Sequence, residues 1–151
     1  MPVENPILNR EKLYNTAVSF LGTDASPMDE APDMLACADS VEEIHFQTFG
    51  EYISGSKTLS TLAMWRKLLK DSTFEKIVTE PMKGDIVISP TGTSRFGGSY
   101  IGHVGIVGDA NKVMSNSSKS GKFEQNYTVL SWKNSFGVKR GFPVYFFRKI
   151  G

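Results

Sequence analysis

One cysteine and two histidines are the first residues in this sequence whose types could do chemistry together. Cys37 lies where a proline-containing acidic segment gives way to a helical pattern, so we expect it in the first turn of a helix. There the positive end of the helix dipole and free backbone N–H groups favour a thiolate, the nucleophilic form of cysteine. The alternative is a small buried core residue, which free cysteines often are. Cys37 is therefore a candidate nucleophile that needs a base nearby.

His103 is the candidate base, and it lies in the run GHVGIV, which is otherwise typical of a buried strand. Strand alternation puts His103, Gly105 and Val107 on one face. We expect that face to carry the helix with Cys37, because a glycine beside the histidine clears space over the sheet. Neutral imidazole can take the thiol proton and later protonate a leaving amine. The alternative is a core histidine with satisfied hydrogen bonds. His45 is the weaker candidate, two helical turns beyond the cysteine.

A Cys–His pair usually needs a third polar group on the far nitrogen of the ring. The strand expected after a tight turn ends in polar residues, and this end can return close to His103. Asn116 is the first choice, because an amide oxygen can accept the imidazole N–H, and Ser115 is the second. The alternative is that Asn116 is an ordinary polar residue of a loop, with no role in a site. Asp39 and Asp85 are lesser candidates, and Asp85 better fits turn chemistry before its strand.

Periodicity indicates which elements position these side chains. Helical spacing predicts helices over residues 10–21, 37–49 and 60–70, with loops at 23–36 and 90–100. Short apolar runs predict strands at 86–89, 102–108, 112–115, 127–131 and 143–148, with a strand or helix tail at 74–78. Helices followed by strands predict an α+β fold, with N-terminal helices packed on an antiparallel sheet.

Composition limits the classes of function. A chain of 151 residues is expected to form one domain, residues 1–151, and its net charge of +1 comes from 17 basic and 16 acidic residues. This balance argues against a nucleic-acid partner or an anionic membrane surface. A single cysteine forms no internal disulfide, and no zinc-ligand spacing or phosphate loop is present, so we expect no metal and no cofactor. No signal peptide is visible at the N-terminus, so we expect synthesis in the cytoplasm.

Four stretches, in this order, resemble the papain-like peptidoglycan peptidases and amidases of the CHAP and NlpC-type superfamily: CADSV, PMKGDIVIS, IGHVGIVG and SNSS. The resemblance covers roughly residues 35–116. It implies a papain-like fold, with Cys37 as nucleophile, His103 as general base and Asn116 as third member. It also implies cleavage of amide bonds in cell-wall peptide. The sequence departs from the pattern at Ala36, where the NlpC type usually has aspartate, and at Asn116, where many CHAP members have glutamate.

The resemblance carries further expectations about substrate and setting. The substrate is a peptidoglycan peptide, and Trp65, Phe96 and Tyr100 are candidates to line its groove, although aromatic residues are more often core. The chain is also similar to small phage and prophage proteins. This implies a lysis or tail role, with holin or tail components as partners and action on the cell wall after release. The alternatives are a cysteine protease or acyltransferase on another substrate, and a non-catalytic binding module of the same fold.

Overall fold

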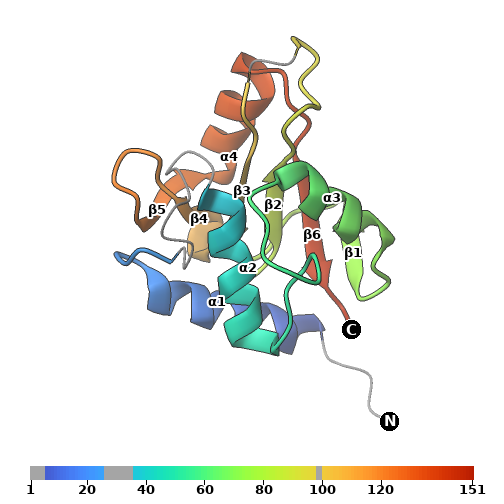
Figure 1. Cartoon of the computed structure of the whole chain (residues 1–151), viewed down its shortest axis with the longest axis vertical. Helices are drawn as coiled ribbons and strands as arrows, with labels where there is room; N and C mark the ends of the chain where they lie inside the picture. Colours follow the sequence, from blue (N-terminus) through green and yellow to red (C-terminus); the bar gives the residue numbers. More distant parts are fainter. Residues whose placement is uncertain (1–5, 26–35, 98–99) are drawn as a thin grey trace.

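The structure, a computed structural model of the whole chain, describes residues 6–25, 36–97 and 100–151. In these residues the strands form one antiparallel sheet with the order β1-β6-β2-β3-β4-β5 (Figure 1). The C-terminal strand β6 therefore lies between β1 and β2. The strands are β1 (Phe74–Ile77), β2 (Ile86–Ser89), β3 (His103–Val107), β4 (Lys112–Asn116), β5 (Phe123–Thr128) and β6 (Tyr145–Lys149).

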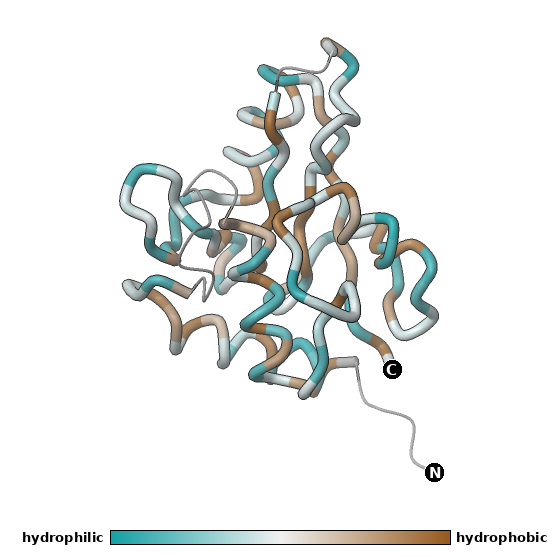
Figure 2. Tube along the Cα trace, in the orientation of Figure 1, coloured by the Kyte–Doolittle hydropathy of each residue, from teal (hydrophilic) through white to brown (hydrophobic). Residues whose placement is uncertain are grey.

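Helices cover both faces of this sheet. One face packs against α1 (Pro6–Phe20), α2 (Ala36–Phe49) and α3 (Thr61–Lys70). The other face is covered by α4 (Val129–Trp132) and the π-helical turn η3 (Lys133–Lys139). Strand β2 is buried along its whole length, since its alternate side chains enter the two cores in turn. Figure 2 accordingly shows apolar, brown segments along the inner strands.

The structure confirms the predicted α+β order, and one predicted strand is wrong. Residues 127–131 were expected to form a strand, but β5 ends at Thr128 and Val129 begins α4. The side chain of Thr128 accepts the Ser131 backbone N–H, and the Ser131 hydroxyl accepts the Thr128 N–H. This reciprocal cap is a helix-start signal that stops the strand. Much of the loop expected at 23–36 lies outside the described residues.

Asp85 is a structural residue of the sheet, as its turn chemistry suggested. Its carboxylate is fully buried and accepts hydrogen bonds from Arg148 Nε and Nη2, both at 2.8 Å. It also accepts the Met82 backbone N–H, at 2.8 Å. The preceding Gly84 has a φ of 89°, and a Cβ there would lie 2.1 Å from the Arg10 carbonyl oxygen. The PMKGD turn therefore joins β2 to β6 and to α1.

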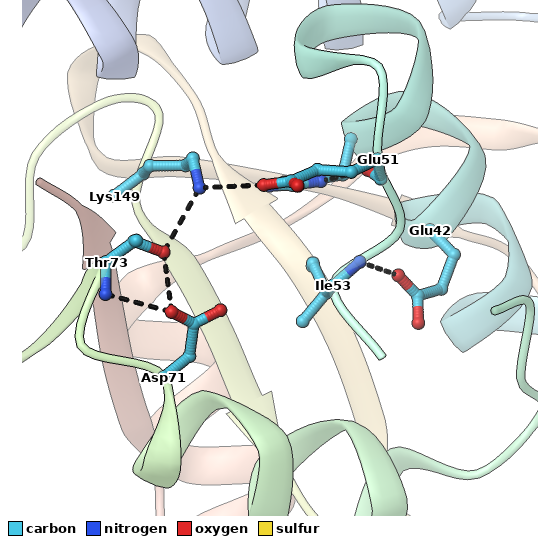
Figure 3. Close-up of polar contacts among 7 residues, drawn as sticks. Glu42, Glu51, Ile53, Asp71, Thr73 and Lys149 are labelled. Carbon is cyan, nitrogen blue, oxygen red and sulfur yellow. Dashed lines mark hydrogen bonds and ion pairs between the residues drawn. The ribbon is translucent and has the colours of Figure 1, made fainter. Parts of the chain in front are cut away.

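A second polar cluster fixes the loop that follows α2 (Figure 3). Lys149 Nζ lies 3.5 Å from Glu51 Oε1 and 3.2 Å from Thr73 Oγ1. The buried Glu42 carboxylate accepts the Ile53 backbone N–H at 2.6 Å, and burial raises the pKa of this carboxyl. These contacts connect α2 with β6. Within the described residues, no helix is both long and apolar enough to cross a bilayer.

Candidate active site

Cys37 is the second residue of α2, as the sequence predicted, and it is only 2% exposed. Its sulfur is approached by the backbone N–H groups of Val104, Ala38 and Cys37 itself, and each of these contacts lowers the thiol pKa. Burial nevertheless dominates and raises the pKa of Cys37 to about 11. The prediction that the thiol pKa is lowered is therefore wrong, because the cost of desolvating the thiolate is larger than the stabilisation that the start of the helix gives it.

The Val104 N–H reaches the thiol because β3 and β4 are only partly paired. Their register joins Ile106 to Met114 and Val107 to Val113, so Val104 lies beyond the paired stretch. Its other neighbour is Ile88 of β2. The sulfur of Cys37 therefore lies next to the residue that follows His103 in β3.

The imidazole of His103 is held by a chain of side-chain hydrogen bonds. Its Nε2 lies 2.9 Å from Ser115 Oγ, and the Ser115 hydroxyl donates to Asn126 Oδ1 at 2.7 Å. A serine hydroxyl has one proton. Since that proton goes to Asn126, Ser115 accepts the Nε2–H of His103, and the ring lone pair is on Nδ1. This tautomer is the one in which Nδ1 can act as a base.

The His103 ring is also packed among aromatic side chains. It stacks on Trp132 at 5.2 Å between ring centroids and on Phe136 at 5.4 Å. Burial, followed by the nearby charge of Arg140, lowers the pKa of His103 to about 4. The ring is therefore neutral near pH 7, as general-base catalysis requires.

The face assigned to His103 from the sequence is wrong. Val104 and Ile106 share the core on the α2 face with Cys37, whereas His103 packs with Trp132 on the α4 face. The apolar residues of β3 fill the helix core, so alternation sends the histidine to the opposite face. Cys37 and His103 both belong to the described residues, and no hydrogen bond joins the thiol to the ring.

The hydrogen-bond partner of His103 is the second choice, Ser115, and not Asn116. Alternation along β4 puts Asn116 on the face of Met114, and its side chain is 1% exposed. Neither amide atom of Asn116 has a hydrogen-bond partner among the described residues. Asn126 is not among the predicted site residues, because the strand predicted at 127–131 begins too late to include it. A strand expected over FEQNYT would have placed Asn126 beside β4.

The residue before His103 is a glycine for a steric reason. A Cβ at Gly102 would lie 2.0 Å from the Ser89 carbonyl oxygen and 2.5 Å from the Thr91 backbone nitrogen. Its own N–H donates to Thr91 Oγ1 at 2.8 Å. Only a glycine allows this approach of backbone to backbone, and the approach fixes the start of β3.

A cavity of about 560 Å³ opens beside His103. Tyr100, one of the three aromatic residues predicted to line a substrate groove, lies in its lining. The other two aromatic candidates lie elsewhere: Trp65 stacks on Tyr145 at 5.3 Å, and Phe96 is exposed beneath Arg95. The described lining residues are Tyr100, Ile101, Gly102, His103, Asn116, Ser117, Ser118, Lys119, Glu124, Asn126, Tyr127, Phe136 and Arg140. Cys37 is not among these lining residues, so the cavity meets the candidate base and not the thiol.

His45, the weaker candidate, is a buried core residue. Its Nδ1 lies 2.6 Å from the Glu51 carbonyl oxygen, and burial lowers the pKa of its ring to about 4. The ring packs in tilted arrangements against Phe49 and Phe74. His45 therefore has no place beside Cys37.

His45, which is buried, and His103, which is half-buried beside the cavity, predict that acid destabilises the fold. Their pKa values near 4 lie below the ordinary 6.5, so the unfolded chain binds these protons at a higher pH than the folded chain. Their stabilising contribution is complete above about pH 6.5 and is lost as the pH falls to about 4. Glu42, whose pKa is raised, acts in the opposite direction. Each ring loses about 1.4 kcal/mol per pH unit below about pH 6.5, so between pH 7 and 5 we expect the two rings together to lower the free energy of unfolding, from urea titrations, by about 4 kcal/mol before the opposing effect of Glu42.

The variant His45→Gln is the control for this prediction. Removing one of the two titrating rings should remove about half of the histidine contribution, about 2 kcal/mol between pH 7 and 5, whatever the substitution does to stability at pH 7. An unchanged slope in His45→Gln, or wild-type stability that rises toward pH 5, would contradict the assignment of neutral rings.

Comparisons with known proteins support the fold. No protein-family model and no curated protein matches the sequence. Among solved structures, a chain of the type VI native effector-immunity complex Tae3-Tai3 from Ralstonia pickettii superposes with a TM-score of 0.55. The two chains are 16% identical, and the match covers 93% of this chain and 98% of that one. The chain therefore has an α+β fold of the papain-like type, as predicted. The narrower resemblance to CHAP and NlpC-type enzymes stays a prediction.

Proposed function

We propose that this chain is a cysteine hydrolase that cleaves amide bonds in bacterial cell-wall peptide. The observation that carries the proposal is the position of Cys37 in the first turn of α2, a helix that packs on β3, the strand that begins with His103. The second support is the fixed tautomer of His103, whose Nε2 is held by Ser115 while Nδ1 keeps its lone pair. A nucleophile at a helix start and an oriented base on the neighbouring strand are the parts that thiol catalysis needs.

The proposed reaction starts from a neutral pair, since the raised pKa of Cys37 and the lowered pKa of His103 keep both groups uncharged at pH 7. Sulfur attacks the amide carbonyl while Nδ1 of His103 takes the thiol proton. The N–H groups of Cys37 and Ala38 are candidates to stabilise the oxyanion. The C–N bond then breaks, His103 gives its proton to the amine, and water hydrolyses the thioester.

The reaction requires Sγ and Nδ1 to come within hydrogen-bond reach, about 3 Å for typical catalytic pairs. Such contacts are often long without substrate and tighten in the complex. Because the two side chains lie on opposite faces of the sheet, the proposal requires the first residues of β3 or of α2 to rearrange when substrate binds, and a change of side-chain rotamer alone is not enough. The substrate class follows from the resemblance of CADSV, PMKGDIVIS and IGHVGIVG to peptidoglycan peptidases.

A second candidate function is a non-catalytic binding module of the same fold. The buried thiol favours it, because an active nucleophile needs access to substrate. The neighbour's effector-immunity complex also makes a protein partner a reasonable proposal for this chain.

Both candidate functions predict that the Cys37 thiol of the resting protein is labelled slowly. A pKa of about 11 instead of 9.0 leaves about a hundredfold less thiolate near neutral pH. We expect iodoacetamide to alkylate Cys37 at least about a hundred times more slowly than it alkylates an unfolded control.

The effect of ligand on this labelling distinguishes the two candidates. If sacculi or soluble cell-wall peptides accelerate or block alkylation of Cys37, the thiol takes part in the ligand site. A rate that stays at the resting value with every cell-wall ligand favours the binding module. The unfolding midpoint, measured in the same samples, shows whether an increase in labelling comes from loss of structure.

Release of peptide fragments from purified sacculi tests the hydrolase directly. Wild type should release muropeptides with new amine and carboxyl ends, detected by mass spectrometry, and Cys37→Ala should release none. Because Ala36 and Ala38 flank this position, alanine suits the local helix. Release by both proteins would show that another group does the chemistry. Release by neither, with cleavage of a protein substrate, would favour the protease alternative.

A further inference from the structure

The cavity beside His103 contains positive charge that no described carboxylate neutralises. Arg140 and Lys119 both line it, and neither forms an ion pair among the described residues. The acidic side chain of the lining, Glu124, accepts a hydrogen bond from the Ser120 hydroxyl at 2.6 Å. The lining therefore has an excess of positive charge, although the whole chain is nearly neutral.

Arg140 is held in a defined position in this lining. Its guanidinium lies over the ring of Phe136, 4.8 Å from the centroid, and its backbone carbonyl accepts a hydrogen bond from the Ser94 hydroxyl. Phe136 also stacks on His103. The guanidinium and the imidazole thus pack against the same aromatic ring. Any group bound to Arg140 is consequently close to the candidate base.

A buried amide lies on the same cavity. Asn116 lines the cavity, and its Oδ1 and Nδ2 have no hydrogen-bond partner among the described residues. A buried polar group without a partner costs free energy, which a ligand can recover by bonding to it. Because both amide atoms are buried and the side chain lies on the face of Met114, a ligand in the cavity could reach this amide only after the side chain moves.

We propose that this cavity binds a free carboxylate of the peptide substrate, with Arg140 as the anchoring residue. The proposal rests on the proposed hydrolase function and adds a substrate class to it: peptides with a free carboxylate near the scissile amide. The planar guanidinium fork matches a carboxylate in two parallel hydrogen bonds, and partial burial strengthens them. Amidation of the carboxylate removes this charge, so amidated peptides should be poor ligands.

The test is a binding measurement with the full chain carrying Cys37→Ala, so that turnover cannot consume the ligand. The probes are a synthetic stem pentapeptide with free carboxylates and the same peptide with every carboxylate converted to a primary amide. Calorimetry should give a dissociation constant at least about tenfold lower for the free form. Adding Arg140→Gln should abolish this preference, and Arg140→Lys should keep part of it. Adding Lys139→Gln, an exposed cation outside the lining, should leave it unchanged.

Equal dissociation constants for the two peptides would overturn the proposal, as would a preference that survives Arg140→Gln in a folded protein. Turnover separates this result from the fate of the hydrolase. If wild type cleaves both peptides equally well, the hydrolase stands and the carboxylate site fails. If the binding preference is found but wild type cleaves neither peptide, the carboxylate site stands and the hydrolase fails.

Discussion

Replacing His103 with glutamine is expected to lower kcat/KM for amide cleavage by about a thousandfold, the range expected for loss of a general base. Glutamine can still donate a hydrogen bond to Ser115, but it cannot accept a proton near pH 7. The buried thiol depends on this base more than an exposed thiol would, because its raised pKa leaves almost no thiolate. Initial rates on soluble cell-wall peptides, with the folded fraction checked by circular dichroism, measure the effect.

The matched control is His45→Gln, the same substitution at the other histidine. His45 forms a hydrogen bond with the Glu51 backbone carbonyl and lies outside the cavity lining. Its loss is expected to change stability while leaving kcat/KM per folded molecule unchanged. The assignment of His103 would be contradicted if both variants lost activity equally, or if His103→Gln kept the wild-type rate.

Replacing Asp85 with alanine is expected to lower the free energy of unfolding by about 3 kcal/mol, since breaking a buried ion pair leaves a charge without its partner. The loss includes two hydrogen bonds from Arg148 and one from the Met82 N–H. The Arg148 side chain is only 17% exposed, so water cannot fully replace the carboxylate. Urea titration at pH 7, compared with the wild type, gives the change.

Asp109→Ala provides the control, because Asp109 is exposed in the turn between β3 and β4. We expect a change within about 0.5 kcal/mol there. The double variant Asp85→Ala with Arg148→Met removes both charges and should be more stable than Asp85→Ala alone. An equal effect at Asp85 and Asp109 would show that the ion pair contributes little to the fold.

Local signals in the sequence predict most of the fold. Continuous apolar runs with turn residues on both sides located β2 and β3 within a residue, and the Cys37 helix began one residue before its predicted start. The strand expected at 127–131 failed because Thr128 and Ser131 cap a helix, a signal that competes with β propensity. The missed element η3 lacks the regular period of an α-helix.

The candidate site was only partly predictable, since its geometry depends on how the two cores pack. Alternation along GHVGIV separates His103 from Val104, but does not say which of them faces α2. The same uncertainty applies to Ser115 and Asn116 in β4: alternation puts them on opposite faces of the sheet, but it does not say which of them lies on the face of His103. The pKa of Cys37 is also a tertiary property: the helix start is visible in the sequence, whereas the burial that outweighs it is not.

Mass mapping of the protein, after acid quenching during turnover of a soluble cell-wall peptide, shows directly whether the Cys37 thiol is the nucleophile. We expect an acyl group of the substrate's mass on the tryptic peptide that contains Cys37, formed while amine product is released. We expect no such adduct in Cys37→Ala and slower formation in His103→Gln. Continued release of product by Cys37→Ala, with no adduct on the wild-type thiol, would show that Cys37 is not the nucleophile.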